Sequence, residues 1–73
     1  MIDEQAAAEL ELAANKAAAV AEEENTREAH VRAESALYSA AYAYDELGQK
    51  EKAAPLWRQA LKHRDAVEAI GDV

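Results

Sequence analysis

The sequence contains no cysteine and no phenylalanine, and it has only two glycines and one proline among its 73 residues. Without cysteine the chain has neither a disulfide framework nor a thiolate for metal or redox chemistry. Glycine and proline are the residues that most strongly interrupt helices, and here they are Gly48, Pro55 and Gly71. The first forty-seven residues therefore contain no helix-breaking residue. A chain this short forms at most one domain. These absences predict a single all-α domain over residues 1–73.

Large apolar side chains are also scarce. Hydrophobic residues make up 51% of the chain, but twenty of them are alanines, and leucine, isoleucine and valine together number only twelve. Alanine is the best helix former, so this composition favours helices around a thin core over disordered coil.

Basic residues are outnumbered, and the formal net charge is −7. This excess argues against binding to nucleic-acid phosphates or to anionic membranes. Residues 1–28 hold eight acids and two bases, a net charge of −6, so a basic partner would meet this segment first. The acidic start is unlike a secretory signal, and no window reaches the length of a membrane span. We therefore expect a cytoplasmic protein without membrane insertion.

The first predicted helix covers residues 3–23, with Asp3 at its start. One narrow apolar stripe of the coiled-coil type recurs along it at steps of four and three. We expect this stripe to contact another chain, either a second copy or a partner. Its small side chains would bury too little apolar area to stabilise a single monomer. The stripe consists of Ala6, Leu10, Ala13, Ala17 and Val20.

A second helix is predicted over residues 26–47, with an apolar stripe that is out of phase with the first. A turn at residues 24–26, with Asn25 as the cap of the second helix, would let both stripes face one core. A pairing of Glu23 with Arg27 would instead support one continuous helix. We favour the turn.

The third predicted helix covers residues 52–70. Gly48 directly follows Leu47, and we expect this glycine to close the second helix in a left-handed conformation. Proline is tolerated only in the first turn of a helix, so Pro55 indicates that the third helix starts near residue 52. The sequence therefore predicts three helices.

Residues 34–65 resemble a single tetratricopeptide repeat, a helix-turn-helix unit of roughly 34 residues. The most specific matches are the turn glycine Gly48, the small residues Ala53 and Ala60, and the aromatic Trp57. The resemblance implies that Trp57 is buried where the two helices cross, against Ala40, Ala41 and Tyr44. It also implies a face that binds a peptide or helix of a partner protein, formed by Ser35, Tyr38, Tyr42, Asp45 and Glu46.

The same hairpin is similar to the start of a microtubule-interacting and trafficking domain of the spartin and spastin type, through residues 45–53. In that family the extra helix follows the hairpin, whereas here it precedes the hairpin. One isolated repeat leaves its hydrophobic faces exposed to water. We therefore expect the first helix or another chain to pack against the hairpin.

Few residues suggest chemistry. His30 and His63 have no metal-ligand spacing, and we interpret His30 as a solvated partner of Glu34 and His63 as a complement to a helix dipole. Ser35 and Ser39 have no adjacent base. We therefore predict no enzyme activity, no metal site and no cofactor.

The favoured function is that of a non-enzymatic adaptor or regulatory subunit that binds another protein. Tyr38 and Tyr42 are the main candidates for contact, with partial burial against the first helix as the alternative. A second hypothesis is a structural building block of a homo-oligomer or larger complex. A third is a small acidic inhibitor that occupies a basic site on its target.

Overall fold

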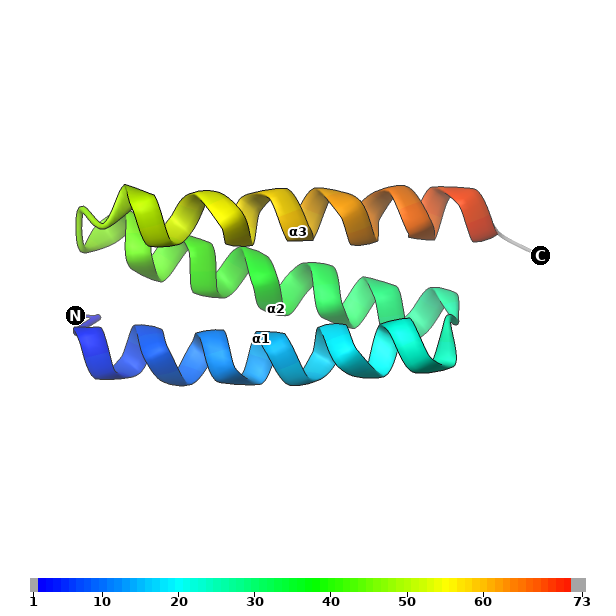
Figure 1. The fold of residues 1–73 in the computed structure, drawn as a ribbon, viewed down its shortest axis with the longest axis horizontal. Coiled ribbons are helices and arrows are strands. Elements are labelled where there is room, and N and C mark those ends of the chain that lie inside the picture. The colour runs from blue at the N-terminus through cyan, green and yellow to red at the C-terminus, as the bar shows by residue number, and fades with distance from the viewer. Residues whose placement is uncertain (1, 72–73) are drawn as a thin grey trace.

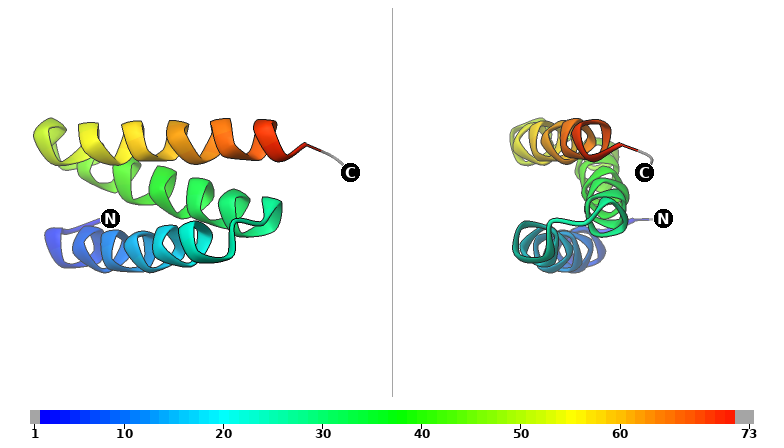
Figure 2. Two further views of the ribbon diagram at one scale, coloured as in Figure 1. Left: turned by 45° about the vertical axis from the view of Figure 1, so that its right-hand side comes forward. Right: turned by 90° about the vertical axis from the view of Figure 1, so that its right-hand side faces the viewer.

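The computed structural model describes residues 2–71, and within this range it contains three helices and no strand (Figure 1). The helices are α1 (Glu4–Glu24), α2 (Arg27–Glu46) and α3 (Lys50–Ile70). The prediction of an all-α, three-helix fold is confirmed. Helix α2 runs antiparallel to both neighbours and packs against each of them, while α1 and α3 make almost no direct contact. Seen end-on, α1 and α3 lie on the same side of α2, so the arrangement is open (Figure 2).

A tight turn separates α1 from α2, as the out-of-phase stripes predicted. Asp3 caps α1 by accepting the Ala6 N–H at 2.8 Å, and Thr26 caps α2 by accepting the Ala29 N–H at 3.2 Å. Asn25 was predicted to cap α2, but it instead closes α1 in the left-handed conformation, with φ of 52°. Asparagine tolerates this conformation better than most residues, while the threonine hydroxyl suits the extended cap position.

The turn between α2 and α3 depends on Gly48, whose φ of +76° confirms the predicted left-handed conformation. The N–H of Gln49 donates to the Tyr44 carbonyl at 2.9 Å and closes the end of α2. Helix α3 begins at Lys50, two residues before the expected start, so Pro55 lies inside the helix. The missing N–H of Pro55 affects only the carbonyl of Glu51, an exposed residue in the first turn, which explains why the helix tolerates it.

A side chain added at Gly48 would not clash with its surroundings, because a Cβ there has no atom within 4 Å. The loss of stability on substitution therefore measures the strain of the left-handed backbone alone. We expect Gly48→Ala to lower the free energy of unfolding by about 1 kcal/mol and Gly48→Val by more. Gly48→Asn should retain more of the stability, since asparagine visits the left-handed region. Urea unfolding followed by circular dichroism measures the three values. Equal stability of Gly48→Val and the wild type would contradict the turn assignment.

The core is built mainly from alanine. Helix α1 contributes only small buried residues, namely Ala7, Ala14, Ala18 and Ala21, and these pack against α2. Leu37 is the one large side chain among the described residues that is completely buried. Small residues at the contact let the helix backbones approach closely, so little apolar area is needed to fill the space between them.

The buried face of α1 differs from the predicted stripe. Leu10 and Ala17 pack at the edge of the core and Ala6 is half-buried, but Ala13 and Val20 are exposed. Alanines occupy adjacent positions along this helix, so the apolar pattern fits two neighbouring phases, and the structure adopts the other one. Helix α1 thus covers α2 of the same chain.

A buried tyrosine of α2 forms a hydrogen bond to α1. The Tyr44 hydroxyl donates to Glu11 Oε1 at 2.7 Å, and Tyr44 is 3% exposed. The hydrogen bond to Glu11, together with burial and the negative charges of Glu11 and Glu4, raises the pKa of Tyr44 to about 12. The side chain of Gln49 donates to Glu4, which joins the second turn to the start of α1. Charge-assisted bonds of this kind compensate for the small apolar area.

Candidate functional site

Three aromatic rings meet where α2 and α3 lie side by side, and we refer to Tyr38, Tyr42 and Trp57 as the aromatic cluster. The Tyr38 and Trp57 ring centroids are 5.4 Å apart with tilted planes, and the Tyr42 ring meets Trp57 edge-on at 5.1 Å. These are the separations and angles at which aromatic rings attract each other, so the cluster has a defined geometry.

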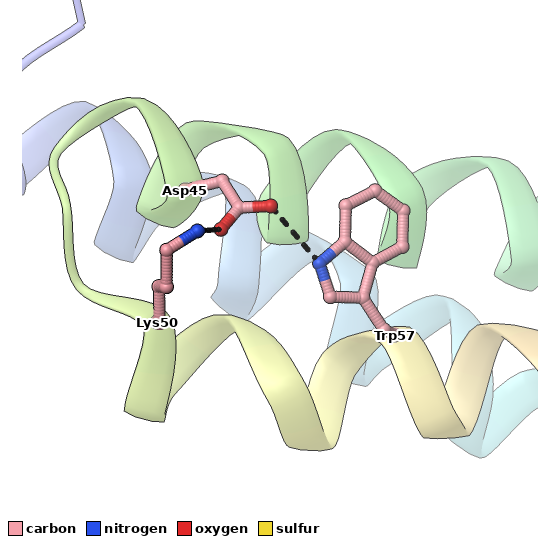
Figure 3. A network of polar contacts seen from close by, with 3 residues as sticks. All are labelled: Asp45, Lys50 and Trp57. Carbon is pink, nitrogen blue, oxygen red and sulfur yellow. Dashed lines mark hydrogen bonds and ion pairs between the residues drawn. The ribbon is translucent and has the colours of Figure 1, made fainter.

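A polar network holds the indole ring through its N–H group (Figure 3). Trp57 Nε1 donates to Asp45 Oδ2 at 3.2 Å, and Lys50 Nζ lies 3.6 Å from Asp45 Oδ1. The Lys50 side chain is 84% exposed, so its ion pair with Asp45 is screened by water and contributes little to stability. Asp45 therefore orients Trp57 while remaining open to exchange of its cationic partner.

Exposed apolar residues lie on the same helices as the aromatic cluster. Tyr42 is 63% exposed, and Val31, three turns earlier on the same face of α2, is exposed as well. Leu61 is exposed one turn after Trp57 on α3. Single exposed apolar residues are common on proteins, but here one of them, Tyr42, belongs to an ordered ring cluster and another, Leu61, follows one turn after its Trp57. We call Val31, Tyr42 and Leu61 the exposed strip.

Trp57 packs against the core, as predicted, but it lies at the edge of the core and is not completely buried. Trp57 is half-buried and contacts Tyr38 and Tyr42, while Leu56 is the neighbouring side chain that is buried in the core. The ring partner of both tyrosines lies on α3, and Tyr38 is partly buried while Tyr42 is exposed. An indole N–H needs an acceptor, and Asp45 provides one at the surface.

Of the five predicted partner-binding residues, the structure brings Tyr38, Tyr42 and Asp45 together around Trp57. Ser35 and Glu46 are exposed on α2 but are not part of this network, and the Ser35 carbonyl accepts a hydrogen bond from the Ser39 hydroxyl. Three of the five predicted residues, the two tyrosines and Asp45, thus share one surface.

A buried histidine pair is the feature that the sequence interpretation missed. His30 Nδ1 lies 2.8 Å from His63 Nδ1, and both side chains are buried between α2 and α3. The expected solvated His30–Glu34 pair and the helix-end role of His63 are therefore wrong. The spacing within the hairpin could have predicted this contact. His30 lies seventeen residues before Leu47 and His63 lies fifteen residues after Gly48, so the two histidines are at nearly the same distance from the turn along the antiparallel helices.

Within residues 2–71, no group of three or more histidine, aspartate or glutamate side chains is arranged to bind a metal ion. Over the same range, none of the helices combines the length and apolar character that crossing a membrane requires.

Comparison of the chain with protein-family models, with curated proteins and with solved structures finds no match. The function therefore has to be inferred from the surfaces described above.

Proposed function

We propose that this chain is a non-enzymatic interaction module that binds another protein through the aromatic cluster and the exposed strip. The observation that carries the proposal is the ordered exposure of Tyr42, a large ring that is 63% exposed yet held edge-on against Trp57. Tyrosine and tryptophan supply large contact areas for little loss of side-chain entropy, and they dominate binding energies at interfaces. A ring that is already held in place loses even less entropy on binding.

The partner that fits this surface is an amphipathic helix or peptide with basic residues beside its apolar face. Its apolar side chains would cover Tyr42 and Leu61. A lysine or arginine of the partner would reach Asp45, whose present partner Lys50 is mobile enough to be displaced since it is 84% exposed. The resemblance to a tetratricopeptide repeat supports this mode, because the corresponding helix of that family faces its peptide ligands.

Site-specific photocrosslinking tests the proposal. A benzoylphenylalanine residue in place of Tyr42 should capture a partner. The same residue in place of Gln59 should not, because Gln59 is exposed two residues from both Trp57 and Leu61 and so lies on another side of α3. With the captured partner, Tyr42→Ala should weaken binding by at least tenfold, by the usual magnitude of interface hot spots. The matched control is Leu12→Ala on α1, where the side chain is 59% exposed.

Trp57 provides a direct readout, because it is the only tryptophan of the chain and lies inside the proposed surface. Its emission should change on titration with the partner. The proposal fails if crosslinks form equally from both positions or if Tyr42→Ala binds as tightly as the wild type.

A second candidate function is assembly with copies of the same chain through α1. The favouring observation is that Leu12 and Val20 are exposed on α1, together with Ala13 of the predicted stripe. Light scattering on the intact chain distinguishes the two functions. If an oligomer forms, Ala13→Glu should dissociate it without unfolding the monomer, because Ala13 lies outside the core. A monomer under all conditions favours binding to a different protein.

A further inference from the structure

The hydrogen bonds of the histidine pair determine where its protons lie. His30 Nε2 is 2.9 Å from Asn25 Oδ1, an oxygen that only accepts, so this nitrogen carries a hydrogen. In a neutral His30 ring, Nδ1 is then an acceptor, and His63 Nδ1 donates its hydrogen across the 2.8 Å contact. One shared hydrogen therefore holds the two rings together.

Proton counting shows how many further protons this contact tolerates. A first added proton can reside on His30, whose Nδ1–H then donates to a neutral His63 that carries its hydrogen on Nε2. A second added proton places an N–H on both nitrogens that face each other at 2.8 Å. Two like charges and two donors without an acceptor then oppose each other, so the contact is lost.

The location of the pair gives that loss a structural consequence. His63 is the last buried residue of α3, and beyond it Ala66, Val67 and Ile70 are only half-buried. His30 joins this site to the turn between α1 and α2 through Asn25. The pair is therefore the last firm attachment of the α3 carboxyl end to α2.

We propose that the His30–His63 pair is a proton-operated latch, closed with at most one added proton and opened by the second, which frees the carboxyl end of α3 from α2. The charged groups around it come from all three helices. Glu22 of α1 favours protonation of His63 and Lys62 of α3 opposes it, while Arg27 and Glu34 lie about one turn before and after His30 on α2.

The electrostatics of His63 agree with this geometry. Burial, followed by the proximity of His30 and Lys62, lowers the pKa of His63 below its ordinary value of 6.5, against the opposing effect of Glu22. A histidine with a lowered pKa binds fewer protons when folded than when unfolded. Its contribution to stability is therefore present above pH 6.5 and is lost as the pH falls below that value towards the folded pKa.

Nuclear magnetic resonance of the intact chain tests the latch. The Cε1 proton of His63 should titrate with a midpoint below that of a free histidine, and its curve should show coupling to the second ring. Glu22→Gln should lower this midpoint and Lys62→Gln should raise it, because each removes one of the opposing charges.

Hydrogen exchange measures the opening itself. Protection of the amides after His63 should fall by at least tenfold between about pH 7.5 and pH 5, consistent with up to a tenfold change per pH unit for each linked proton. Amides near Leu56 and Ala60 should change less, since apolar contacts hold them. The double variant His30→Gln/His63→Gln should show no such fall, because glutamine does not titrate.

Two results would overturn the latch. One is independent titration of both rings with a His63 midpoint at or above about 6.5, the value of an unperturbed histidine. The other is an equal loss of protection in the double glutamine variant. If that variant fails to fold, the coupled titration of the wild-type rings and the pH dependence of wild-type amide protection still decide the question.

Discussion

Replacing Leu37 with alanine is expected to lower the free energy of unfolding by about 3 to 5 kcal/mol, the range measured for buried leucines. Leu37 is the one large side chain among the described residues that is completely buried, and only Leu56 and Tyr44 are large core side chains of comparable burial. A chain of this length has a total stability of about 4 to 11 kcal/mol at typical values per residue. Leu37→Ala should therefore lose from about a quarter to all of the stability, and it should unfold at a much lower urea concentration than the wild type.

The matched control for Leu37→Ala is Leu12→Ala, which makes the same chemical change on α1 where the leucine is 59% exposed. Its effect should stay within about 0.5 kcal/mol, as is usual for surface substitutions. Urea unfolding of both variants, followed by circular dichroism, gives the comparison. Equal losses would mean that Leu37 is not the centre of the core.

The second large effect is expected from adding volume to the alanine contact between α1 and α2. Ala14 is completely buried, and the buried positions of α1 are all alanines. Ala14→Leu adds three carbon atoms where the backbones approach closely, so the helices must separate. We expect a loss of about 3 kcal/mol, at the upper end of the usual cost of overpacking.

Ala19→Leu is the control for Ala14→Leu, because Ala19 is exposed on the same helix. Leucine and alanine have similar helix propensities, so Ala19→Leu should change stability by less than about 0.5 kcal/mol. Thermal unfolding of the two variants side by side provides the test. If Ala14→Leu is as stable as Ala19→Leu, α1 does not pack closely against α2.

The sequence was sufficient to predict the helices and their turns because those depend on local signals. Asp3, Gly48 and the polar run before Thr26 act through hydrogen bonds and backbone conformations within a few residues. The packed face of α1 depends on which of two adjacent alanines meets α2. Ala13 and Ala14 have the same hydropathy, so periodicity alone does not distinguish them.

The candidate site was predicted in part for the same reason. Tyr38, Tyr42 and Asp45 share a side of α2 through steps of three and four, which the sequence displays directly. Trp57 lies at the edge of the core and not at its centre, because its neighbour Leu56 faces the core. The histidine pair was missed because apolar patterns contain no information on polar groups that satisfy each other across a hairpin.

The middle position of α2 also determines how this chain reaches its folded state. Its helix contacts join sequence neighbours, either α1 with α2 or α2 with α3, so the loops that must close are short. Chains dominated by such local contacts fold in microseconds to milliseconds. Each hairpin contains α2, so whichever hairpin forms first presents α2 already ordered to the remaining helix. Substitutions within α2 should therefore slow folding, whereas those in the outer helices should mainly accelerate unfolding.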